Sequence, residues 1–190
     1  CRIRTWLFDN EEPRIIGDWT WKDFTDLYKN NNSEQWAFPK RRNFDISKDA
    51  KLLGYGRDRS VYIRSIEPSA HTSETLVGMH DHEISAVLFH PNGNHIASAD
   101  VTGEIRIWSL SEISKNPIRV IGSKGTVWNL FFSPSGSFFV ASYTNATMYV
   151  WDMNGPKDAE PLTFRRRNVS NFIAFDPLDR WVASPFDNSI

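Results

Sequence analysis

The sequence predicts an all-β protein built from repeated sets of four short antiparallel strands, and three recurring patterns support this prediction. The first is an alternating apolar stretch that ends in Trp, at Trp6, Trp108 and Trp151. The second is an aromatic residue, one further residue and Pro, as in FHP, FSP and FDP, and the third is the triplet IAS or VAS. The second and third patterns recur every 42 to 44 residues. Agreement of separate patterns on one period indicates a repeat architecture.

Each unit has the composition of short strands separated by turns. The stretches at 84–89, 95–99 and 104–108 are rich in β-branched and aromatic residues. A weaker fourth strand follows each Trp, at 117–122 and 160–164. Four short antiparallel strands in each period of about 43 residues form one blade of a β-propeller.

The turns between the first and second strands have their own signature. PNGN at 91–94 places Gly where a positive φ is favoured, and PSGS at 134–137 repeats it. The stretch before residue 36 departs from this repeat, because it lengthens the period to 58 residues. Its apolar residues at intervals of three predict a short helical insertion near residues 19–32, which is either a decorated loop or a docking element.

Composition and charge exclude several classes of protein. The 190 residues are 40% hydrophobic and 24% charged, as in an ordinary globular domain. The net charge of −1 gives no field that favours nucleic acid or an anionic membrane. No run approaches the roughly 18 apolar residues of a transmembrane helix, so we expect no membrane partner. The single Cys excludes an intrachain disulfide and favours a reducing compartment, so we expect a cytoplasmic location.

Residues 78–109 read GMHDHEISAVLFHPNGNHIASADVTGEIRIWS. This stretch resembles a WD40 repeat, whose pattern has Gly-His before the first strand, Phe-Ser-Pro-Asp-Gly after it, Leu-Ala-Ser-Gly in the second strand and Trp-Asp at the end of the third. Residues 117–152 and 162–190 resemble the repeat too, and residues 36–65 do so more faintly. The resemblance implies a WD40 β-propeller.

The expected organisation is a partial propeller with about four blade periods. The segments are the end of one blade (1–9), an insertion between blades (10–35), a divergent blade (36–69), two further blades (70–113 and 114–157) and a truncated blade (158–190). Trp6 and Trp108 hold the same position, the end of a third strand, so the chain begins within a blade. We therefore expect the remaining blades, or other domains of the same protein, to lie outside this chain.

The resemblance also implies a structural role for several polar residues. In the family, a buried His–Ser–Trp–Asp hydrogen-bond network ties the strands of each blade together, and such a network needs every partner. The unit at 78–109 has His80, Ser98 and Trp108, but Thr102 stands at the Asp position. The matching residues of the other units are Trp6, Asp58, Ser142, Trp151, Ser184 and Asp187. Because no unit has all four residues, we expect blades held mainly by aromatic packing.

No motif in the sequence predicts catalysis. Nucleophile elbows, paired catalytic carboxylates and HExxH motifs are absent. The pair His80 and His82 has no Cys or carboxylate at a known metal-ligand spacing, and GYGRDR at 54–59 lacks the third Gly of a phosphate-binding loop. We therefore expect no enzyme activity, no metal and no cofactor. The basic runs at 39–42 and 164–167 lack interleaved aromatic residues, so nucleic acid is not an expected partner either.

The resemblance places the candidate partner-binding face at one end of the blades. Rigid blades hold the loops at this end in fixed positions, which lowers the entropic cost of ordering a binding surface. Trp and Tyr are frequent interface anchors, so Trp128 and Tyr143 are the first candidates to bind a protein or peptide partner. The other candidates are Glu83, Asp100, Arg166, Arg167 and Phe186.

Two functions stay open from the sequence. The chain is either a non-enzymatic scaffold that recognises protein segments, or a regulatory or sensor propeller appended to an enzyme outside this chain, such as a kinase, a protease-like domain or an NTPase. A catalytic domain encoded before Cys1 would favour the second function.

Overall fold

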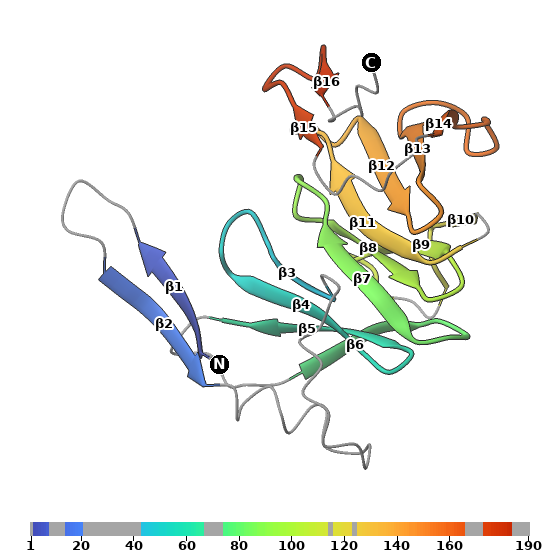
Figure 1. Cartoon of the computed structure of the whole chain (residues 1–190). Helices are drawn as coiled ribbons and strands as arrows, with labels where there is room; N and C mark the ends of the chain where they lie inside the picture. The colour runs from blue at the N-terminus through green and yellow to red at the C-terminus, as the bar shows by residue number, and fades with distance from the viewer. Residues whose placement is uncertain are drawn as a thin grey trace.

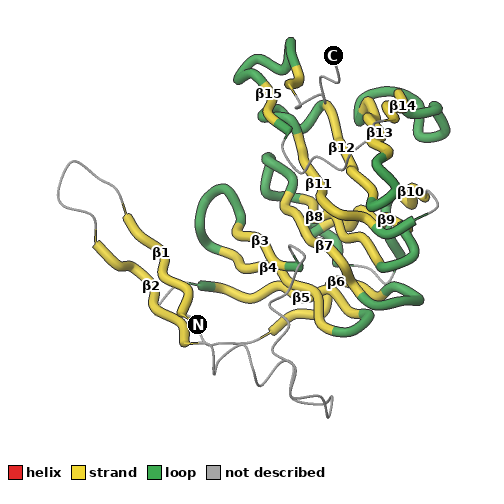
Figure 2. Tube along the Cα trace, in the orientation of Figure 1, coloured by secondary structure: helices red, strands yellow, loops and turns green. Residues whose placement is uncertain are grey.

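The computed structural model describes residues 2–7, 14–20, 43–66, 74–113, 116–122, 125–165 and 173–183, with only the backbone course at 2–7 and 14–20. The strands are β1 (Arg2–Leu7), β2 (Arg14–Thr20), β3 (Phe44–Ile46), β4 (Leu52–Arg57), β5 (Ser60–Ser65), β6 (Glu74–Met79), β7 (Ile84–Phe89), β8 (His95–Asp100), β9 (Glu104–Ser109), β10 (Arg119–Gly122), β11 (Val127–Phe132), β12 (Phe138–Tyr143), β13 (Thr147–Asp152), β14 (Leu162–Arg165), β15 (Ala174–Phe175) and β16 (Val182–Ala183). All regular structure in these ranges is β-strand (Figure 2). None of the described residues belongs to a helix that is long and apolar enough to cross a membrane.

The strands form three four-stranded antiparallel sheets and two hairpins. The sheets are ordered β3-β4-β5-β6, β7-β8-β9-β10 and β11-β12-β13-β14, and the hairpins are β1-β2 and β15-β16. Each sheet therefore follows the chain order of one predicted blade, which confirms the all-β class and the four-stranded unit. In Figure 1 the three sheets fan out, with β1-β2 at one end of the fan and β15-β16 at the other.

The hydrophobic cores lie between neighbouring sheets. On β9, Ile105 and Ile107 join the core shared with the β11–β14 sheet, whereas Trp108 joins the core shared with the β3–β6 sheet. Successive residues of a strand point to opposite faces, so a strand with a sheet on each side buries both of its faces. This explains why stretches such as ISAVLF are apolar almost throughout instead of alternating strictly with polar residues.

The turn between the first and second strands recurs in four units with one geometry. Its third residue has a positive φ in each case, at Ala50 (56°), Gly93 (75°), Gly136 (82°) and Asp179 (59°). These residues are 43 positions apart, and each donates its backbone N–H to the carbonyl oxygen three residues earlier at 2.8–3.0 Å. The predicted Gly turns are confirmed, and the shared turn identifies β15 and β16 as the first and second strands of a further unit.

The expected helical insertion is not supported. Residues 14–20 form β2, which pairs with β1, so residues 19 and 20 of the predicted helix are strand. Residues 21–32 lie outside the described residues.

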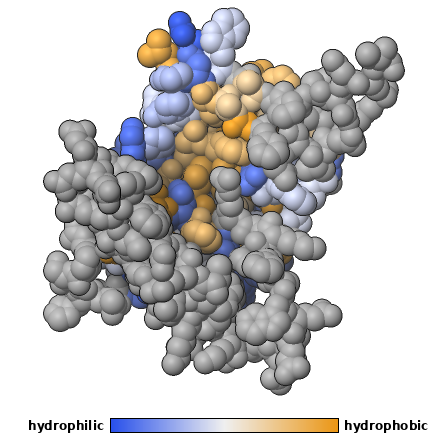
Figure 3. Space-filling view, turned by 60° about the vertical axis from the view of Figure 1, so that its left-hand side comes forward, coloured by the Kyte–Doolittle hydropathy of each residue, from blue (hydrophilic) through white to orange (hydrophobic). Residues whose placement is uncertain are grey.

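Part of the apolar surface of the sheets reaches solvent. In Figure 3 apolar side chains gather in a central strip of the described surface, with hydrophilic groups along its upper border. The large apolar side chains that are exposed include Leu162 and Phe164 on β14 and Leu178 and Trp181 in the β15–β16 hairpin. Exposed apolar area of this kind marks surfaces that other elements can cover.

Candidate functional site

Five loops at one end of the three sheets are joined by hydrogen bonds into a continuous surface, which we call the loop rim. It comprises residues 58–59, 80–83, 101–103, 125–126 and 144–146. The bonds run from Ile84 N to Asp58 O (2.7 Å), from Val101 N to Glu83 O (2.9 Å), from Thr126 Oγ1 to Val101 O (2.8 Å) and from Thr144 N to Thr126 O (3.0 Å). The loops of neighbouring blades thus hold one another, which preorganises this end for binding.

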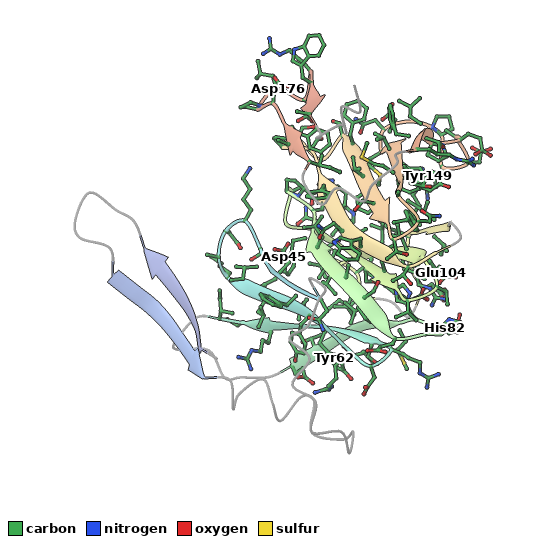
Figure 4. All side chains as sticks on the ribbon, viewed as in Figure 1. Asp45, Tyr62, His82, Glu104, Tyr149 and Asp176 are labelled. Atoms are coloured by element: carbon green, nitrogen blue, oxygen red, sulfur yellow. The ribbon has the colours of Figure 1, made fainter. Side chains whose placement is uncertain are left out.

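Figure 4 shows the two ends of the sheets. His82 and Glu104 lie at the end that carries the loop rim, whereas Asp45 and Asp176 lie at the end that carries the turns between first and second strands. The two ends therefore present separate surfaces, and the predicted face corresponds to the first of them.

A buried polar network lies directly beneath the loop rim in the sheet β7–β10. The indole Nε1 of Trp108 donates to Ser98 Oγ at 2.8 Å, and Ser98 Oγ lies 2.7 Å from His80 Nε2. His80 Nδ1 lies 3.4 Å from Asp100 Oδ2. With the proton of His80 on Nδ1, the Ser98 hydroxyl donates to Nε2 and each of these contacts joins one donor to one acceptor. The four side chains are all buried.

Asp100 corrects the expectation that no unit has a complete network. It stands two residues before Thr102, the residue at the family's Asp position, yet its carboxylate reaches His80. Its other oxygen, Oδ1, accepts from Thr102 N (2.9 Å), Thr102 Oγ1 (2.7 Å), Gly103 N (3.1 Å) and Glu104 N (3.2 Å). The carboxylate of Asp100 therefore has two roles: Oδ1 orders the turn, and Oδ2 completes the network.

The surroundings shift the pKa values of both ionisable members of the network. Burial lowers the pKa of His80, so the neutral imidazole is the form that the folded chain favours. Burial by itself raises the pKa of Asp100, but the hydrogen bonds from the hydroxyl and backbone N–H of Thr102 outweigh it and leave the pKa lowered. Asp100 is thus a carboxylate beside a neutral His.

His80, Asp100 and Glu104 form the one group of potential metal ligands among the described residues, with ligand atoms within 4.8 Å of one another. The chemistry of these atoms does not favour a cation. Both ring nitrogens of His80 face partners within the network. Glu104 forms an ion pair with Arg106, whose guanidinium also donates to Asp81 Oδ2 at 2.9 Å. A metal would have to displace these contacts beside a fixed positive charge.

The sheet β11–β14 has no such network among its described residues. Ser142 holds the position of Ser98 in the triplet motif, but its hydroxyl is buried and has no hydrogen-bond partner among the residues described. Trp151 is buried by packing against Phe139 and Tyr149. In this sheet the expectation of aromatic packing without a full network agrees with the geometry.

The remaining residues predicted for the network contribute differently. Asp58 is an exposed turn residue with a φ of 52°, and only its backbone carbonyl takes part in the loop rim. Trp6 lies in β1, where only the backbone is described. Ser184 and Asp187 lie outside the described residues.

Trp128 occupies a β-bulge at the loop rim. The pairing of β11 with β12 shifts between Val127 and Asn129, so Trp128 is the extra residue. The same bulge occurs in β7, where Ser85 is fully buried and its hydroxyl donates to backbone carbonyls of β8. Trp128 is instead partly exposed. A large aromatic side chain thus stands at the rim where the equivalent unit has a small buried one, and bulges often serve to redirect a side chain.

The other candidates for the partner-binding face are distributed unevenly. Glu83 is exposed on the loop rim. Asp100 and Tyr143 are buried, and the Tyr143 hydroxyl donates to Gly103 O of the preceding sheet at 3.2 Å. Tyr143 thus links two sheets and Asp100 orders a turn within its own sheet, so their placement does not support the expectation that they contact a partner. Arg166, Arg167 and Phe186 lie outside the described residues.

The sequence alone predicted no role for Asp81 or Arg106. Arg106 donates to Met79 O at 2.6 Å as well as to Asp81 and Glu104, and thereby pins the loop between β6 and β7. Alternation along β9 puts Arg106 and Glu104 on the same face. The contact with Asp81, 25 residues earlier in the loop between β6 and β7, depends on how the sheets β3–β6 and β7–β10 pack together.

Two segments of the chain match a family model, and about half of the chain is similar to proteins of known name. The model described as "WD domain, G-beta repeat" matches residues 72–109 and 115–152. The chain is 34% identical over 111 residues to the human protein named "Telomerase Cajal body protein 1", a match that covers 54% of this chain and 20% of that protein.

Two further relatives have similar extents. Over 90 residues the chain is 37% identical to "Nuclear distribution protein nudF" of Emericella nidulans, with 46% of this chain and 19% of the relative covered. Over 101 residues it is 29% identical to "Guanine nucleotide-binding protein subunit beta" of Zea mays, a match that covers 50% of this chain and 26% of that protein. The matches thus span about a quarter or less of these proteins.

Proposed function

The chain carries WD40 repeats at residues 72–109 and 115–152, and we propose that it is a non-enzymatic recognition module that binds a segment of another protein at the loop rim. Homologues with WD40 repeats are generally scaffolds for protein interactions, which supports this class of function. The ring nitrogens of His80 contact Asp100 and Ser98, which supports a structural role for the buried network.

The observation that carries the proposal is the position of Trp128. The bulges at Ser85 and Trp128 are equivalent by pairing register, but only Trp128 has an aromatic side chain that is partly exposed, two residues after the loop 125–126 of the rim. Large aromatic residues that are rigidly held and partly exposed contribute a large share of binding energy at protein interfaces. Because neighbouring loops are hydrogen-bonded to one another, little loop ordering is needed when a partner binds.

The test uses a selection that works without an identified partner. The chain is used to select binders from a displayed library of random peptides, and the affinity of the enriched peptides is measured by fluorescence anisotropy. Trp128→Ala is expected to weaken their binding by about 30-fold, the effect of losing an interface anchor worth about 2 kcal/mol. Trp181→Ala, which removes an exposed Trp outside the loop rim, is the matched control and is expected to have no effect.

Urea unfolding of the same variants separates binding from packing. If Trp128→Ala lowered the free energy of unfolding while the peptides bound as before, Trp128 would be a packing residue and its role as an anchor would be rejected. If the library gave no specific binder at all, the proposal of a recognition module at the rim would itself be overturned.

A further inference from the structure

Arg119 on β10 is a buried cation at the border of a hydrophobic core. The residue is only 9% exposed. It lies opposite Ile107, and Ile121, two residues later, lies opposite Ile105, so Arg119 shares one face of the sheet with these three apolar side chains. The three Ile residues belong to the core between this sheet and the sheet β11–β14. A guanidinium carries a positive charge, and burying a charge is costly unless the charge is paired.

The contacts of the guanidinium do not compensate this charge. Its Nη1 contacts Met153 Sδ at 3.6 Å, and its Nη2 donates to Lys157 O at 3.2 Å. A thioether sulfur is a weak acceptor, and a backbone carbonyl has no net charge. The Nε of Arg119 is buried and has no hydrogen-bond partner. Among the residues that the structure describes, no carboxylate forms an ion pair with Arg119.

A second cation lies beside Arg119. Lys157 is exposed in the loop between β13 and β14, and its Nζ donates to Ile118 O, the residue before Arg119, at 3.4 Å. The backbone of Lys157 thus contacts the guanidinium while its ammonium group is held at the start of β10. Three exposed acids lie in or next to this loop without forming an ion pair with either cation: Asp152, Asp158 and Glu160. Two positive charges therefore share a small region, where an anion between them would be stabilised.

A basic residue at this place is not a requirement of the repeated unit. The register place of Arg119 is taken by Thr75 in the sheet β3–β6 and by Leu162 in the sheet β11–β14. A neutral side chain is therefore sufficient to build the fourth strand of a blade. The positive charge is specific to the sheet β7–β10, which favours a binding role over a purely structural one.

We propose that Arg119 and Lys157 form a binding site for the phosphate group of a small molecule. A phosphate group carries a charge of about −1.5 to −2 near neutral pH, which matches the two cations, and the guanidinium fork suits its oxygen atoms. Lys157 O already holds one acceptor oxygen at Nη2, and a phosphate oxygen can replace it when the loop moves outward. Because Arg119 is so deeply placed, a small anion fits this position better than a folded partner does.

Isothermal titration calorimetry with inorganic phosphate tests the proposal, at pH 7.5 and at an ionic strength kept constant with sodium chloride. Arg119→Met is expected to weaken phosphate binding at least about tenfold, the effect of losing charge-assisted hydrogen bonds. Lys157→Met keeps the backbone carbonyl and removes only the exposed charge, so a loss of about threefold is expected. The matched control is Arg180→Met, which removes an exposed Arg already paired with Asp176 and should leave binding unchanged.

Urea unfolding separates binding from a structural role. Without phosphate, Arg119→Met is expected to keep or raise the urea midpoint, because it removes a buried charge that lacks a counter-ion. Adding 10 mM phosphate in place of chloride should raise the midpoint of the parent chain and of Arg180→Met, but not that of Arg119→Met. Stabilisation that persisted in Arg119→Met would reflect general exclusion of phosphate from the protein surface, and would overturn the proposal.

Other outcomes also count against the site. If phosphate did not bind the parent chain, or if Arg119→Met lost stability without any change in phosphate affinity, Arg119 would be a structural residue. If acetate bound as tightly as phosphate, the assignment to a phosphate group would be wrong, and a carboxylate would be the anion. The loop that contains Lys157 follows the third strand β13 and lies at the end of the sheet away from the loop rim. The result therefore does not depend on peptide binding at Trp128.

Discussion

Ser98 and Ser142 hold the same position in neighbouring sheets, and replacing each by Ala is expected to change stability in different directions. In Ser98→Ala the loss of Oγ removes the partner of His80 Nε2 at 2.7 Å and of Trp108 Nε1 at 2.8 Å. His80 and Trp108 are 3% and 1% exposed, so water cannot readily replace the lost contacts. A buried polar group left without a partner costs about 1–3 kcal/mol.

With two groups affected, we expect Ser98→Ala to lower the free energy of unfolding by about 2–5 kcal/mol. Among the described residues the buried hydroxyl of Ser142 has no partner, so Ser142→Ala removes a polar atom that they leave desolvated without compensation. Its effect is expected to lie between zero and about 1 kcal/mol of stabilisation. The two substitutions delete the same atom, which makes each the control for the other.

Urea unfolding followed by far-ultraviolet circular dichroism measures both effects. The protein concentration is held constant in all measurements. Equal slopes of free energy against urea are required before the midpoints are compared. If both variants lost stability by the same amount, the polar network around His80 would not be the feature that distinguishes the two sheets.

Two other substitutions and the pH provide further tests. Gly136→Ala is expected to cost about 2–4 kcal/mol, because a left-handed φ is unfavourable for Ala and the new Cβ would meet the ring of His90. Gly93→Ala, with a similar φ and open space around it, is expected to cost about 1 kcal/mol in the same unfolding assay. Burial lowers the pKa of His80, so the unfolded chain binds its proton first and stability should fall as the pH drops below about 6.5. The urea midpoint at pH 8 and pH 5.5 measures this loss, and a flat profile would contradict a neutral buried His80.

Much of the fold was predictable because the repeat fixes the strands locally. The alternation in EIRIW, the Gly turns and the 43-residue period each depend on a few neighbouring residues, and they gave the four-stranded units in the correct order. The predicted helix near residues 19–32 is not supported where the structure describes it. Residues 19 and 20 continue a strand that pairs with β1, and pairing partners override a weak helical pattern.

The site was less predictable because equivalent positions have different surroundings. Tyr143 seemed an interface anchor, yet its hydroxyl reaches Gly103 O in the adjacent sheet and its side chain is fully buried. Asp100 seemed to be a surface acid, yet it completes the network of His80. Neither fact is encoded in the spacing along the chain, since both depend on the distance between strands of different sheets.

The sequence by itself determined the repeated unit, the position of Trp108 and Trp151 at the end of a third strand and the turns that need a positive φ, because these features depend on local alternation and backbone conformation. Only the tertiary structure decided which polar groups find partners and which apolar side chains remain open. Ser98 and Ser142 occur in the same triplet motif, but Ser98 is bonded twice and Ser142 has no partner in the part of the chain that the structure describes. Burial and hydrogen bonding are properties of neighbours brought together by folding, and identical local sequence patterns can therefore have different energies.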